Sequence, residues 1–185
     1  MSEDINSRKK FSLHIKVWFF SYLGLVATGL IFPFEILYPM VIENQLMMQY
    51  IQEHISAAMK ISAKTKFPEF AFVYIVWVAL FSAPYLIWTL FTPYITPRKN
   101  LVFTKRRMVF LLIGIPIFIV GLIWTVTQGS GGGLEGGRGD FWVYLYSNKG
   151  VFSIVIALFW FFAIFGFWGF RQLLLTTIKK DIEIR

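Results

Sequence analysis

The 185-residue chain has no cysteine and only two histidines. Disulfides, thiolate nucleophiles and cysteine-ligated metals are therefore excluded. An apolar run separates His14 from His54. If that run crosses a membrane, the two histidines lie on opposite sides of it and cannot share a metal or haem site within a monomer. Gly-x-Ser-x-Gly and His-Glu-x-x-His motifs are also missing. The sequence predicts a protein that is not an enzyme and that uses no metal or cofactor.

Charge is scarce as well. Charged residues make up 15% of the chain and hydrophobic residues 57%, whereas soluble domains average about 25% charged and about 45–50% apolar. So little polar surface cannot cover a soluble fold of this size. The composition therefore indicates that lipid surrounds much of the chain.

Four apolar runs are long enough to cross a bilayer, which takes roughly 20 residues of helix. None shows the alternating polarity of a transmembrane barrel strand. We predict an all-α, polytopic membrane protein: a four-transmembrane-helix bundle with an extra outward-facing amphipathic helix. The predicted spans are 17–39, 70–91, 108–127 and 151–170, the connectors are 40–69, 92–107 and 128–150, and the tails are 1–16 and 171–185.

Basic residues predict the orientation. Both tails and connector 92–107 carry thirteen Lys and Arg residues together, and the other two connectors carry five. Short loops rich in Lys and Arg stay cytoplasmic, so we expect both termini in the cytoplasm, with a bacterial inner membrane as the location. The same charges can also contact anionic lipid headgroups, while no nucleic-acid-binding module is present. The candidate lipid contacts are Arg98, Lys99, Lys105, Arg106 and Arg107.

Glu35 is the only acidic residue inside a predicted span. Pro33 precedes it and is expected to bend or end the helix. A helix that begins at Val17 places Glu35 about 27 Å along its axis, close to the outer interface. We expect an interfacial carboxylate that folding does not require. The alternative is an intramembrane polar site, with Glu35 binding a proton or cation or pairing with a basic residue.

Two outward segments are candidates for partner contact. Within 40–69, Met47, Ile51 and Ile55 recur at helical spacing and form one apolar face. Before the fourth span, the aromatic run that includes Trp142 and Tyr144 follows a glycine-rich stretch, and such side chains are enriched at binding hot spots. The competing interpretation is that both segments lie on the membrane surface. A Cu(I) site using methionine thioethers is not supported, because Met-x-x-Met repeats are missing.

These features favour a protein that acts by contact with another integral membrane protein. In length, span number and topology the chain resembles immunity proteins of pore-forming bacteriocins and plasmid entry-exclusion proteins. That resemblance implies a small, non-catalytic inner-membrane factor, and it transfers no individual residue. The alternative is a structural or accessory subunit of a transport, secretion or respiratory complex. Membrane lipids are expected partners in either case, and the chain can also associate with copies of itself.

Overall fold

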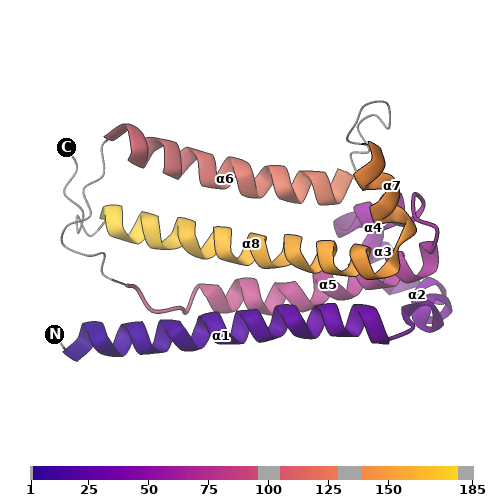
Figure 1. The fold of residues 1–185 in the computed structure, drawn as a ribbon, viewed down its shortest axis with the longest axis horizontal. Helices are drawn as coiled ribbons and strands as arrows, with labels where there is room; N and C mark the ends of the chain where they lie inside the picture. The colour runs from indigo at the N-terminus through magenta and orange to yellow at the C-terminus, as the bar shows by residue number, and fades with distance from the viewer. Residues whose placement is uncertain (1, 96–104, 129–138, 179–185) are drawn as a thin grey trace.

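The computed structural model describes residues 2–95, 105–128 and 139–178, and every element within them is helical. Figure 1 shows the long helices running side by side and the short helices gathered at one end. The long helices are α1 (Ser2–Ile31), α5 (Pro68–Thr89), α6 (Lys105–Gln128) and α8 (Lys149–Ile178). The short elements are η1 (Phe34–Leu37), α2 (Tyr38–Glu43), α3 (Gln45–His54), α4 (Ser56–Ser62) and α7 (Gly139–Ser147).

Three of the long helices contain segments long and apolar enough to cross a membrane: Lys9–Ile31, Pro68–Thr89 and Lys149–Ile178. Within the described residues the all-helical prediction is confirmed, and the three candidate spans support a membrane protein. α6 is 24 residues long, but within its described side chains the apolar stretch covers only Val109–Phe118. The count of four spans therefore stays a prediction.

The helix ends follow local chemistry. α1 stops at Ile31, two residues before Pro33, where the sequence predicted a bend or an end. Pro68 occupies the first turn of α5. N–H groups in the first turn have no partner within the helix, so the missing N–H of proline costs no helical hydrogen bond. Asn148 caps α8, since its side-chain Oδ1 accepts a hydrogen bond from the backbone N–H of Val151 at 3.1 Å.

The first and last helices extend farther than the apolar runs. α1 begins at Ser2 and α8 continues to Ile178, so most of the residues expected to form the two tails are helical. Neither extension contains a proline or glycine to break the helix. In α8 the hydroxyls of Thr176 and Thr177 donate to the carbonyl oxygens of Gln172 and Leu173, at 2.6 and 2.9 Å.

Segment 40–69 folds into separate short helices where the sequence predicted one amphipathic helix. Asn44 has an extended backbone and ends α2, and its Oδ1 then accepts the backbone N–H of Met47 to cap α3. Ile55 leaves helical geometry at φ −129° and separates α3 from α4. The side-chain cap at Asn44 competes with continuation of the helix. The spacing of hydrophobic residues carries no information about such a cap and therefore does not predict the break.

Candidate functional site

The short helices form a cap, which we define as residues 34–66 and 139–147, at the end of the bundle where α1 ends and α8 begins (Figure 1). The two parts of the cap are distant in sequence and are joined by a hydrogen bond of 2.9 Å from the Lys66 N–H to the Tyr146 carbonyl oxygen. α4 also packs against α5 and α6. The cap is therefore fastened to the bundle as a folded structure.

The predicted partner-contact face of α3 points into the protein. Ile51 is fully buried, and Met47 and Ile55 are partly buried against the hydrophobic core. These side chains join α3 to the hydrophobic core of the chain, and their role in partner contact stays an untested prediction. The large apolar side chains that α3 exposes are Leu46, at 82% of its surface, and Tyr50, at 47%.

Exposed apolar side chains continue along the cap. Met40 and Ile42 of α2 and Val143 and Tyr144 of α7 are all more than 40% exposed. The neighbouring Leu145 is buried and anchors α7. Trp142 lies in α7, and its side chain is outside the described part of the structure. In α2, α3 and α7, some side chains thus pack inward while others leave apolar surface exposed.

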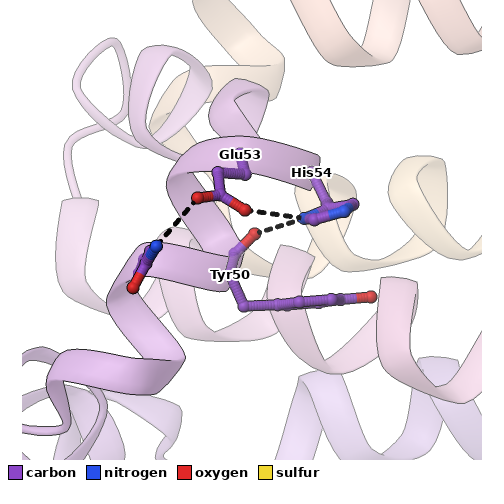
Figure 2. A network of polar contacts seen from close by, with 4 residues as sticks. Tyr50, Glu53 and His54 are labelled. Atoms are coloured by element: carbon purple, nitrogen blue, oxygen red, sulfur yellow. Dashed lines mark hydrogen bonds and ion pairs between the residues drawn. The ribbon is translucent and has the colours of Figure 1, made fainter.

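A polar network lies on the exposed side of α3 (Figure 2). Gln49 Nε2 donates to Glu53 Oε1 at 3.0 Å, and His54 Nδ1 lies 4.0 Å from Glu53 Oε2 and 3.2 Å from the Tyr50 carbonyl oxygen. The His54 ring also stacks on Tyr50, with 4.5 Å between ring centroids. These contacts link neighbouring turns of one helix. Among the described residues, no three His, Asp or Glu side chains gather as a metal site would require.

Glu35 pairs with Lys149 at the end of the bundle that carries the cap. Lys149 Nζ lies 2.8 Å from Glu35 Oε1 and 5.0 Å from the centroid of the Phe70 ring. The hydrogen bond from Lys149, followed by one from the backbone amide of Glu35, holds the pKa of this carboxyl below its ordinary value. The pair therefore adds stability above the ordinary carboxyl pKa and loses it as the pH falls through the lowered pKa. Since both side chains are more than one-third exposed, the contribution is about 0–1 kcal/mol.

Inside the bundle, a polar contact joins three helices where α1 meets α5 and α8. The Tyr74 hydroxyl lies 3.1 Å from the Leu25 carbonyl oxygen and 3.0 Å from that of Ser153. Ser153 Oγ in turn lies 3.1 Å from the Gly29 carbonyl oxygen. A Cβ atom on Gly29 would sit 2.7 Å from the Ser153 side chain and 2.8 Å from the Tyr74 ring. Sequence reasoning missed this contact, because a single glycine in an apolar run does not reveal its neighbours.

The opposite end of the bundle is closed by hydrogen bonds from α8 to the chain that follows α5. Arg171 Nη1 donates to the Thr92 carbonyl oxygen at 2.9 Å. The Gln172 amide donates to the Pro93 carbonyl oxygen at 2.9 Å and accepts the Ile95 N–H at 3.2 Å. Of the predicted lipid contacts, Arg98 and Lys99 lie outside the described residues. The others, Lys105, Arg106 and Arg107, begin α6, and their side chains are likewise not described.

Compared with protein-family models, curated proteins and solved structures, the chain matches none.

Proposed function

We propose that this chain is a non-catalytic integral membrane protein that acts by contact with another integral membrane protein, as a bacteriocin-immunity or entry-exclusion factor does. The observation that supports the proposal is that several apolar side chains of the cap are exposed, namely Met40, Ile42, Leu46, Tyr50 and Tyr144. These side chains lie outside the candidate spans. Exposed apolar side chains that gather into one patch mark sites of protein or membrane contact, and we propose that these residues form such a patch.

The inner side of the cap supports contact with a protein over loose association with lipid. Buried Ile51 and Leu145 anchor α3 and α7, so the exposed side chains stand on a scaffold that is already packed. A preorganised surface loses less conformational entropy when it binds. Tyr50 and Tyr144 also belong to a residue type enriched at interface hot spots.

For the topology, we propose that α6 is the fourth span and that the cap faces outward, with both termini in the cytoplasm. The support is the distribution of basic residues, of which thirteen belong to the tails and connector 92–107. Because the chain has no cysteine, one introduced cysteine gives a labelling signal without background. We expect a membrane-impermeant maleimide to label Leu46→Cys in intact spheroplasts and to label Ile178→Cys only after lysis.

Ile178 is the matched control for this labelling, because it is also an exposed apolar residue, at 68%, and it ends α8 at the opposite end of the bundle. Labelling of both positions in intact spheroplasts, or of Ile178 alone, would contradict the proposed topology.

A charge on the apolar side of the cap should weaken partner binding without unfolding the protein. Leu46 is 82% exposed, so Leu46→Lys buries no charge in the chain itself, whereas in a protein interface it would leave a desolvated ammonium. We expect proteins that co-purify with the tagged chain to fall about tenfold in yield, as for a hot-spot residue.

The matched control for Leu46→Lys is Gln52→Lys, which adds the same charge at an exposed polar position of the same helix. This variant should retain the co-purifying proteins. Equal retention by both variants, at unchanged expression, would show that the cap does not carry recognition. Loss of membrane-inserted protein for Leu46→Lys alone would instead identify α3 as a membrane-surface anchor.

A further inference from the structure

A small pocket opens at the outer end of the bundle, where three candidate spans end or begin. Residues 29–33 at the end of α1 form one wall, Phe70 of α5 forms another, and Glu35, Lys149 and Gly150 complete it. Its volume is about 210 Å³, several times the ~30 Å³ that one water molecule occupies in the liquid. The pocket therefore has room for a small polar group and not for a whole lipid.

The polar side of the pocket carries one charge of each sign. The Glu35 carboxylate and the Lys149 ammonium are 2.8 Å apart, and their side chains are 36% and 47% exposed. Both side chains are therefore partly accessible, while Glu35 Oε2 is itself buried and has no hydrogen-bond partner among the described residues. A ligand with a single negative charge would be attracted by Lys149 and repelled by Glu35 at similar distances, so the two effects largely cancel. A ligand with both charges can place its positive group beside Glu35 and its negative group beside Lys149.

The other side of the pocket is apolar and open to the surroundings. Leu30, Ile31 and Phe32 line it, and each is more than 40% exposed. These residues lie where the first candidate span ends, which is the depth at which phospholipid headgroups meet their acyl chains. A ligand that fits both sides has a zwitterionic head attached to an apolar body.

The Glu35 carboxylate also distinguishes a primary ammonium from a quaternary one. A primary ammonium can donate a charge-assisted hydrogen bond to Glu35, whereas a quaternary ammonium has no N–H to donate. Lys149 uses one of its three donors on Glu35 and keeps others for a phosphate oxygen. Gly150 lies at the N-terminus of α8, where the helix dipole also favours a phosphate.

We propose that this pocket binds the headgroup of a zwitterionic phospholipid that carries a primary ammonium, such as phosphatidylethanolamine. This inference does not depend on the proposed protein partner.

Native mass spectrometry of the full-length chain in mild detergent tests the proposal. The probes are phosphatidylethanolamine, its N-monomethyl and N,N-dimethyl forms, phosphatidylcholine and phosphatidylglycerol, all with the same acyl chains. We expect retained lipid to fall stepwise with methylation, by roughly tenfold or more in all, as for loss of a hydrogen bond to a charged group. Equal retention of the ethanolamine and choline lipids would overturn the proposal. Preference for phosphatidylglycerol would overturn it too, in favour of a simple anion site at Lys149.

Two variants locate the site. Glu35→Gln should reduce ethanolamine-lipid retention to the level of the choline lipid with an unchanged helical signal. Glu53→Gln, which removes an exposed carboxylate from α3, should have no effect. Equal loss in both variants, or no loss in either, would contradict the assignment to this pocket. Soluble phosphoethanolamine is the last arm: we expect it to compete only at large excess. Displacement at equal concentration would show that the apolar wall contributes nothing and that the ligand is not a lipid.

Discussion

Gly29→Ala is expected to destabilise the bundle by about 1–3 kcal/mol, the usual cost of overpacking a filled core. The added Cβ would lie 2.7 Å from both the Cβ and the Oγ of Ser153 and 2.8 Å from the Tyr74 ring. The Ser153 Cβ is fixed to the backbone of α8 and cannot turn away, so α1 and α8 must separate. Separation would also lengthen the hydrogen bonds that Tyr74 and Ser153 make to the α1 carbonyl oxygens.

The chain provides its own control five residues earlier. Gly24 lies in the same helix, and a Cβ there would meet no atom within 4 Å. Gly24→Ala should therefore leave stability unchanged or raise it slightly, because alanine favours helix more than glycine does. The measurement is the free energy of unfolding in mixed micelles titrated with denaturing detergent. Similar values for the two variants would mean that α1 and α8 do not meet closely at Gly29.

Trp18→Ala is expected to have the larger effect, about 3 kcal/mol. Trp18 is fully buried, and its ring contacts Phe165 at 5.1 Å and Trp168 at 6.2 Å between centroids. These rings join α1 to α8. Lipid tails are as apolar as the core, so moving apolar groups between them changes the free energy little. Within a membrane the loss of stability therefore comes from the van der Waals contacts that are missing around the cavity. Phe20→Ala is the matched control, because Phe20 is 67% exposed in the same helix and its removal opens no cavity.

Trp18→Phe separates packing from hydrogen bonding. The Trp18 indole N–H is buried and has no hydrogen-bond partner among the described residues, so removing it should cost little beyond the change in ring size. We expect the unfolding free energy of Trp18→Phe to lie much closer to that of the parent chain than to that of Trp18→Ala. A loss as large as that of Trp18→Ala would show that the indole nitrogen makes an essential contact.

The apolar runs predicted the long helices because a segment that lies in lipid must satisfy its own backbone hydrogen bonds, which a helix does. A long apolar run therefore indicates a helix. The ends were less predictable. Helical hydrogen bonding does not stop where apolar residues stop, so α1 and α8 reach Ser2 and Ile178 beyond their apolar runs. Pro33 was informative, because a proline acts on its own helix whatever surrounds it.

The candidate site depended on contacts between distant residues, which one sequence does not record. The spacing of Met47, Ile51 and Ile55 indicated an apolar face but could not say whether it meets a partner or the chain's own bundle. The structure shows Ile51 buried in the chain's own hydrophobic core. Glu35 was identified as a candidate from its chemistry, whereas its partner Lys149 is 114 positions away. The pairing of these two residues is a property of the fold.

Site-specific photo-crosslinking from the cap tests the central claim of partner contact most directly. A photoreactive amino acid would replace Leu46 in one preparation and Ile178 in another, because both are exposed apolar residues at opposite ends of the bundle. After irradiation in the native membrane, mass spectrometry identifies what each position has captured. We predict one integral membrane protein joined to position 46 and absent from position 178. Capture of lipid alone at position 46, with expression and insertion unchanged, would contradict the claim that this cap recognises a protein.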